Sequence, residues 1–134
     1  AQAISFENET LDTVLNVESS HRYDQFSAFL AEVYRVLKKG GYLLLTDFRY
    51  EYDMHEMKKD IDSSGFEILH YETINTQVVN ALKADDARRK DLVQRLVPRL
   101  LRKTAKSFAG AVGSETFNMF VDSRYVYFVY VLKK

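Results

Sequence analysis

Residues 24–48 read DQFSAFLAEVYRVLKKGGYLLLTDF and predict a helix followed by a buried strand. From Asp24 to Lys38 the apolar side chains recur with the spacing of an amphipathic helix, and Asp24 is a candidate N-cap. Gly40-Gly41 is expected to end this helix, because glycine readily adopts the left-handed conformation of a helix stop. Residues 42–48 are apolar almost throughout, which indicates a strand buried on both faces, as in a parallel sheet.

The regions on either side extend this pattern. Before the helix, Leu11–Val17 is a short β-prone run, so that strand, helix and strand form one right-handed βαβ unit. After it, we expect a helix over residues 54–64 that stops at Gly65, and then a partly exposed strand over residues 66–74.

The last third of the chain predicts helices and one more strand. A long helical region is expected over residues 78–108, and Pro98 must kink or split it. Residues 124–132 are apolar on both alternating faces, which is typical of an interior strand. The fold class is therefore α/β, and a length of 134 residues fits a single domain.

Composition excludes several classes of function. The chain has no cysteine, which excludes disulfides, thiol nucleophiles and cysteine-based metal sites. Its 19 basic and 19 acidic side chains cancel, which argues against nucleic-acid binding. His55-Glu56 begins a zinc motif, but residue 59 is lysine, so no metal site is expected. No leader or apolar run of ~20 residues occurs, and we expect a cytoplasmic location.

The stretch Ile4–Arg49 resembles class I S-adenosylmethionine (SAM) methyltransferases. Its most recognisable part is RVLKKGG at residues 35–41, which is similar to the family pattern E-x-x-RVLkpGG before a strand that ends in aspartate. NVESSH at residues 16–21 is similar to the subgroup of phthiotriol-type and fatty-acid O-methyltransferases, and the closing YVLK at residues 130–133 fits it. The resemblance is strong over Ile4–Arg49 and weak over residues 75–110.

This resemblance implies the C-terminal half of a Rossmann-like sheet, with strands 4, 5, 6 and 7 of the family, flanking helices and an antiparallel last strand. Residues 75–110 would be a helical insertion or lid within that single partial domain. The family holds its cofactor with a Gly-rich loop after the first strand, and no G-x-G-x-x-G motif precedes Leu11. We therefore expect a fragment that is a poor catalyst on its own.

The resemblance places candidate cofactor-binding residues at the end of the first strand. Asn16, Val17 and Glu18 would lie beside the methionine part of SAM, although Asn16 is also a common turn former and Glu18 could be a solvated carboxylate. His21 follows, and an imidazole can accept a proton from a hydroxyl near neutral pH. It is the candidate general base; the alternative is a histidine that bonds to backbone at the helix entrance. Tyr23 would line the acceptor pocket or join the core.

The second strand ends at Thr46-Asp47-Phe48-Arg49. Asp47 and Arg49 are candidate residues for binding the acceptor, or they pair with each other or cap the next helix. The implied reaction is methyl transfer to a hydroxyl or carboxyl of a small, lipophilic acceptor. The alternative is an interaction module that dimerises or swaps strands through the unpaired, apolar edge of Leu11–Val17.

Residues 83–106 contain nine basic and three acidic side chains beside a Leu/Val stripe. We favour a lid helix that packs this stripe on the core and leaves its basic face in water. Binding to an anionic membrane surface, or to an anionic acceptor, is the alternative. The aromatic side chains of residues 125–130 are expected to pack in the core.

Overall fold

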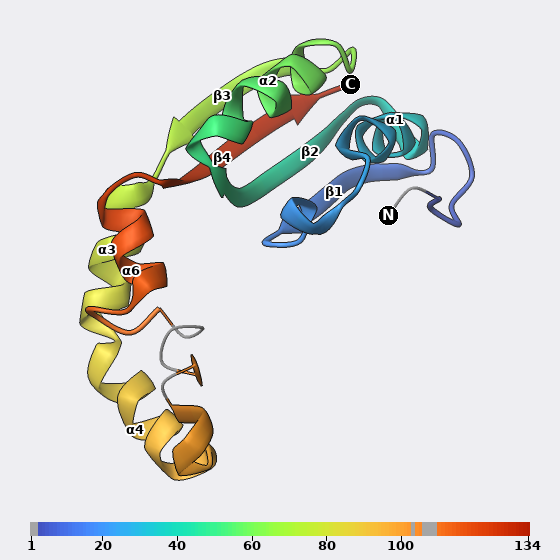
Figure 1. The fold of residues 1–134 in the computed structure, drawn as a ribbon. Helices are drawn as coiled ribbons and strands as arrows, with labels where there is room; N and C mark the ends of the chain where they lie inside the picture. Colours follow the sequence, from blue (N-terminus) through green and yellow to red (C-terminus); the bar gives the residue numbers. More distant parts are fainter. Residues whose placement is uncertain (1–2, 103, 106–109) are drawn as a thin grey trace. The chain divides into compact units, whose positions relative to one another are not determined.

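The computed structural model describes residues 3–102, 104–105 and 110–134, which form two compact units (Figure 1). The sheet unit comprises Ala1–Thr73 and Tyr127–Lys134. The helical unit comprises Ile74–Val126.

The sheet unit is built on four strands in the order β1-β2-β4-β3. They are β1 (Leu11–Val17), β2 (Leu37–Tyr50), β3 (Glu67–Thr73) and β4 (Tyr125–Lys133). β1 and β2 are parallel, whereas β3 and β4 are antiparallel. The α/β class, the βαβ unit and the antiparallel last strand are thus confirmed. The interior position of β4 is confirmed as well (Figure 1).

Two helices, α1 (Phe26–Val36) and α2 (Met54–Asp62), pack on this sheet. The core takes Phe29, Leu30 and Val33 from the predicted stripe of α1, and it takes Leu43 and Leu45 from β2. Two short 3₁₀ turns, η1 (Ser20–Arg22) and η2 (Glu51–Asp53), lead into the two helices.

The expected burial of β2 on both faces is wrong. Leu43 and Leu45 are buried, whereas Tyr42 and Leu44 between them are exposed. Successive side chains of a strand point to opposite faces, and only the face under α1 and α2 is covered by the described residues.

The start and the end of α1 also differ from expectation. Asp24 is not the N-cap, because the helix begins one residue later, after Gln25. The helix ends at Val36, so Gly40 and Gly41 are not its stop but lie inside β2. The backbone requires glycine at both positions. Gly40 has a φ of +78°, and a Cβ on Gly41 would lie 3.0 Å from the Asp12 carbonyl oxygen of β1. The glycines allow β2 to bulge opposite β1 before regular pairing resumes at Tyr42.

The helical unit contains α3 (Asn75–Ala84), α4 (Asp86–Leu96), η3 (Arg99–Leu101) and α6 (Glu115–Val121). Pro98 splits the expected helical region as predicted, and a further break falls at Asp85. The predicted end at Phe108 lies outside the described residues. The sequence interpretation missed α6, although Ser114 is a typical N-cap whose hydroxyl accepts a hydrogen bond from the Phe117 amide.

No helix among the described residues is both long enough and apolar enough to cross a membrane.

Candidate active site

The predicted site residues gather where β1 and β2 end. β1 contributes Asn16 and Val17, the turn after it carries Glu18, and η1 carries His21. β2 contributes Asp47 and Arg49. Parallel strands place their C-terminal ends at one edge of a sheet, which is where open α/β sheets bind ligands.

Asp47 is the buried centre of this cluster. One carboxylate oxygen, Oδ2, accepts hydrogen bonds from the Ser20 hydroxyl at 2.6 Å and from the His21 amide at 2.9 Å. The other, Oδ1, lies 2.8 Å from His21 Nδ1 and 2.9 Å from the Phe48 amide. Burial by itself would raise the pKa of Asp47, but these hydrogen bonds outweigh it and hold that pKa below its usual value.

The ionised Asp47 carboxylate can only accept hydrogen bonds, so the proton of a neutral His21 ring lies on Nδ1. The other ring nitrogen, Nε2, then carries a lone pair. The geometry agrees, because Arg22 Nε donates to His21 Nε2 at 3.4 Å. The Phe48 ring packs against the His21 ring, with their centroids 4.6 Å apart, and restricts the rotation of the imidazole. His21 is therefore an oriented histidine whose Nε2 electron pair accepts a long hydrogen bond from Arg22.

Arg49 lies beside this pair. One terminal nitrogen donates to the Ser20 hydroxyl at 3.0 Å, and another lies 3.4 Å from Asp47 Oδ2. The guanidinium carbon is 5.4 Å from the centre of the Phe26 ring, within cation–π range. Arg49 thus pairs with Asp47, one of the alternatives that the sequence left open.

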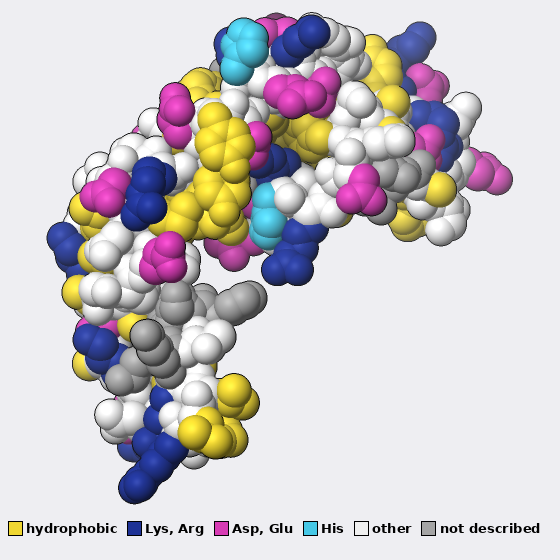
Figure 2. Space-filling view, in the orientation of Figure 1, with side chains coloured by type: hydrophobic (Ala, Val, Ile, Leu, Met, Phe, Trp, Pro, Cys, Tyr) yellow, Lys and Arg dark blue, Asp and Glu magenta, His cyan; other side chains and the backbone are white. Residues whose placement is uncertain are grey.

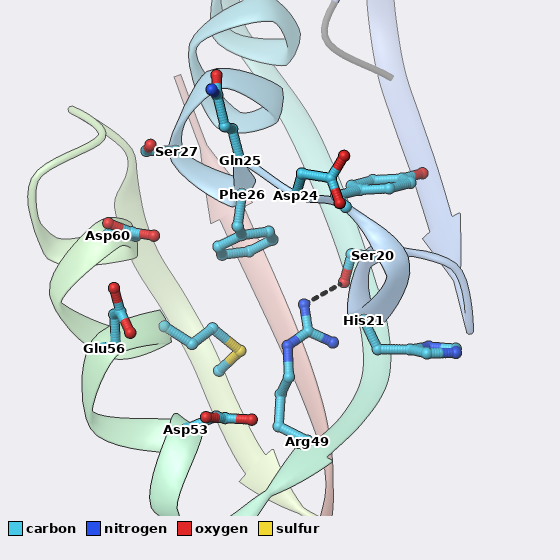
Figure 3. A pocket seen from close by; sticks show the side chains of 12 residues that line it. Ser20, His21, Asp24, Gln25, Phe26, Ser27, Arg49, Asp53, Glu56 and Asp60 are labelled. Carbon is cyan, nitrogen blue, oxygen red and sulfur yellow. Dashed lines mark hydrogen bonds between the residues drawn. The ribbon is translucent and has the colours of Figure 1, made fainter.

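A cavity of about 380 Å³ opens next to His21 and Arg49 (Figure 3). Its walls come from the start of α1, from η1 and from α2, and they include the predicted acceptor residue Tyr23. Phe26 and Met57 supply apolar surface. Four carboxylates surround them: Asp24, Asp53, Glu56 and Asp60. The cavity is small, partly apolar and acidic at its walls.

The end of β1 holds the other predicted residues. Asn16 is buried, and its Nδ2 donates to the Tyr23 hydroxyl at 3.0 Å. Its Oδ1 has no hydrogen-bond partner among the residues that the structure describes. Val17 is exposed and, by strand alternation, faces the opposite side from Asn16. Asn16 is therefore the member of this group whose side chain still offers a buried acceptor.

Glu18 adopts a left-handed backbone conformation with a φ of +47°. Its carboxylate accepts a hydrogen bond of 2.5 Å from the Tyr127 hydroxyl of β4. Burial and the nearby Glu18 raise the pKa of Tyr127, so this hydroxyl keeps its proton and acts as the donor.

Three contributing residues were missed at the sequence level. Ser20 lies within the NVESSH stretch, but nothing in its spacing indicates a bond to Asp47. Phe48 and Tyr127 were attributed to strand packing. Tyr127 is 109 residues from Glu18 in the chain, so only the sheet order could reveal their contact.

The described residues contain no group of three or more His, Asp or Glu side chains that could hold a metal ion. Asp47 and His21 instead form a hydrogen bond with each other.

The chain is similar to known methyltransferases in sequence and in fold. A family model described as "Methyltransferase domain" matches residues 1–45. The structure of Haemonchus contortus phosphoethanolamine N-methyltransferase 2 in complex with S-adenosyl-L-methionine superposes with a TM-score of 0.74. It shares 16% sequence identity and covers 96% of this chain and 34% of that chain, so it shows the fold alone. In sequence and in fold, the chain is similar to SAM-dependent methyltransferases, whose cofactor is S-adenosyl-L-methionine.

Within this class the chain is similar to two mycobacterial enzymes. It is 39% identical over 111 residues to the fatty-acid O-methyltransferase of Mycolicibacterium smegmatis. This alignment covers 83% of this chain and 40% of that protein. It is 33% identical over 134 residues to the phthiotriol/phenolphthiotriol dimycocerosates methyltransferase of Mycobacterium tuberculosis, over 100% of this chain and 50% of that protein. The chain thus spans about half the length of the curated relatives it matches.

Proposed function

We propose that this chain forms part of an enzyme that transfers a methyl group from SAM to a hydroxyl or carboxyl of a small, lipophilic acceptor. The observation that carries the proposal is the His21–Asp47 pair, oriented at the ligand-binding edge of the sheet and adjoining a partly apolar cavity. The names of the two relatives, a fatty-acid O-methyltransferase and a phthiotriol-type methyltransferase, support a lipophilic acceptor.

His21 acts as the general base in this proposal. The acceptor hydroxyl would replace Arg22 at His21 Nε2 and give its proton to that nitrogen. Its oxygen would gain the methyl carbon as the bond between that carbon and the cofactor sulfur breaks, which leaves the cofactor as a neutral thioether. Asp47 then stabilises the resulting imidazolium across the 2.8 Å contact and keeps the ring in the productive tautomer. Because Asp47 is fully buried, we assign it this positioning role in place of the direct acceptor contact expected from the sequence. Tyr23, Phe26 and Met57 line the cavity that receives the acceptor.

The end of β1 fits the amino-acid part of the cofactor. When bound, the cofactor supplies an activated methyl group on a sulfonium. The unpaired Oδ1 of Asn16 is a buried acceptor that an ammonium group would satisfy. The Glu18 carboxylate, held by Tyr127, adds a second acceptor of the required charge. We propose that Asn16 and Glu18 hold the cofactor, and that Val17 contributes through its backbone.

Cofactor binding is tested on a joined protein, in which the part of the M. smegmatis relative that this chain does not cover precedes residues 1–134. We expect calorimetric titration with S-adenosylhomocysteine to give micromolar binding, and Asn16→Ala to weaken it about tenfold, the value of one hydrogen bond to a charged group. Tyr42→Phe, on the exposed face of β2, is the matched control and should leave the affinity unchanged. Equal affinities for wild type and Asn16→Ala contradict the assignment.

The charge of the cavity favours a hydroxyl over a carboxyl. Four carboxylates face one guanidinium there, so an anionic acceptor is repelled. For a long-chain alcohol and the fatty acid of equal length, we expect the joined protein to bind the alcohol about tenfold more tightly at low salt, from roughly 0.5 kcal/mol per carboxylate. High salt and the Asp53→Asn/Glu56→Gln/Asp60→Asn variant should both narrow the difference. Tighter binding of the acid would refute this preference.

A second candidate function is self-association through β1. This strand is an edge of the sheet, and Leu15 and Val17 are exposed on it. An unpaired apolar edge is a template for another strand, either in a dimer or in a strand-swapped assembly. Two measurements distinguish these functions. Sedimentation of the isolated chain detects self-association, and binding of S-adenosylhomocysteine to the joined protein supports methyl transfer.

A further inference from the structure

The end of α4 exposes a group of large apolar side chains. Leu96, Leu100 and Leu101 are 76%, 96% and 58% exposed, and we call these three residues the leucine tip. One helical turn earlier, Val93 is buried, so α4 does have an inner face that packs. Pro98 ends the helix and redirects the chain, which leaves the three leucines in solvent. The predicted stripe comprised Leu92, Leu96, Val97, Leu100 and Leu101. Its expected packing is not seen for Leu92 or for the leucine tip, and the buried residue of α4 is Val93, which lies outside that stripe.

The charges around the leucine tip have one sign. Residues 92–102 read LVQRLVPRLLR and contain three arginines and no acid. The preceding acids are occupied within the helical unit: Asp85 by Arg88 and Arg89, Asp86 by Lys90, and Asp91 by Arg95. Figure 2 shows hydrophobic and basic side chains gathered in this part of the molecule.

The turn that carries the leucine tip is anchored. Arg102 Nε donates to the Val97 carbonyl at 3.0 Å, and Arg102 Nη2 donates to the Gln94 carbonyl at 2.7 Å. These bonds also satisfy carbonyls at the end of α4, where a cation is favoured. The leucines are thus presented by a hydrogen-bonded turn.

We propose that the leucine tip docks on an anionic lipid surface. Leucines would enter the boundary between headgroups and acyl chains, while Arg99 contacts a lipid phosphate, the arrangement of interfacial amphipathic segments. Charge complementarity selects this occupant over a second copy of the chain, because two such tips would bring arginines against arginines. Docking of the leucine tip on lipid does not depend on the chemistry at His21.

The test is co-sedimentation of the 134-residue chain with vesicles of phosphatidylcholine, with and without phosphatidylglycerol. We expect binding to the anionic vesicles at low salt and weak binding to the neutral ones. Leu96→Ser/Leu100→Ser/Leu101→Ser should reduce the partition coefficient about tenfold or more, since these three leucines supply the apolar area that enters the lipid. Ile68→Ser/Leu69→Ser is the matched control: it also removes exposed apolar side chains, but from β3, and should bind as wild type does.

Three outcomes overturn the proposal. The first is absence of binding to anionic vesicles at low salt. The second is a leucine variant that binds as well as wild type while its circular dichroism spectrum is unchanged. The third is a chain that dimerises in solution through the leucine tip, shown by a dimer that the leucine variant loses. Arg99→Gln should reduce the preference for phosphatidylglycerol, and an unchanged preference counts against the assigned role of Arg99.

Discussion

Asp47→Ala is expected to lower the free energy of unfolding of this chain by about 3–5 kcal/mol, the usual loss when one partner of a buried charged group is removed. The substitution leaves the Ser20 hydroxyl and the amides of His21 and Phe48 without their acceptor, and it leaves the Arg49 guanidinium without its buried counter-charge. Chemical denaturation of the isolated chain measures the loss.

Asp12→Ala is the matched control for this experiment. Asp12 also forms an ion pair, with Lys38, but its side chain is 80% exposed, so its removal should change stability far less. Equal losses for the two variants would show that Asp47 does not hold the end of β2 together.

The same carboxylate predicts a direction for the pH dependence. Since the pKa of Asp47 is lower in the folded chain than in the unfolded one, its contribution to stability is complete above the unfolded pKa of about 3.9. That contribution is lost as the pH falls through the lower, folded pKa. In acid denaturation, Asp47→Asn should therefore lose less stability between neutral pH and the acid range than wild type loses.

His21→Ala is expected to lower the turnover number of the joined protein by about 10²–10⁴, the usual contribution of a general base. Cofactor affinity should stay unchanged, because His21 is separate from the Asn16 and Glu18 side chains proposed to hold the cofactor. Asp47→Asn should also lower turnover, since an amide no longer fixes the proton on His21 Nδ1.

His70→Ala is the control for the histidine substitution. His70 lies in the same sheet unit, but it is exposed on the edge strand β3 and contacts Glu72. Its removal should leave turnover as in wild type. A His21→Ala enzyme that stays within a few fold of wild type would remove His21 from the mechanism, and recovery of its rate by added imidazole would support the role.

The sequence predicted those parts of the fold that depend on local pattern. The strand Leu11–Val17 has the predicted bounds, and the stripe of Phe29, Leu30 and Val33 packs in the core. Local pattern could not show which face of β2 is covered, because that depends on helices elsewhere in the chain. It also misassigned Gly40-Gly41, where the real constraint is the carbonyl oxygen of Asp12 on a neighbouring strand.

For the site as well, local sequence predicted the positions of residues but not their long-range contacts. The positions of His21, Asp47 and Arg49 came from a motif, and the edge of the parallel sheet brings them together. Their roles depend on burial, which the sequence does not give: Asp47 looked like an acceptor contact and is instead enclosed by donors. The contact between Tyr127 and Glu18 depends on the placement of β4 beside β2, a long-range feature without a local signal.

Methyl transfer by the joined protein is followed directly with a labelled methyl group. The joined protein is incubated with SAM that carries a tritiated methyl group and with a long-chain alcohol, and the lipid product is extracted. We expect a labelled methyl ether from wild type and from His70→Ala, and almost none from His21→Ala. A joined protein that binds S-adenosylhomocysteine with micromolar affinity, yet transfers no label to the alcohol or to the matching fatty acid, would contradict this expectation.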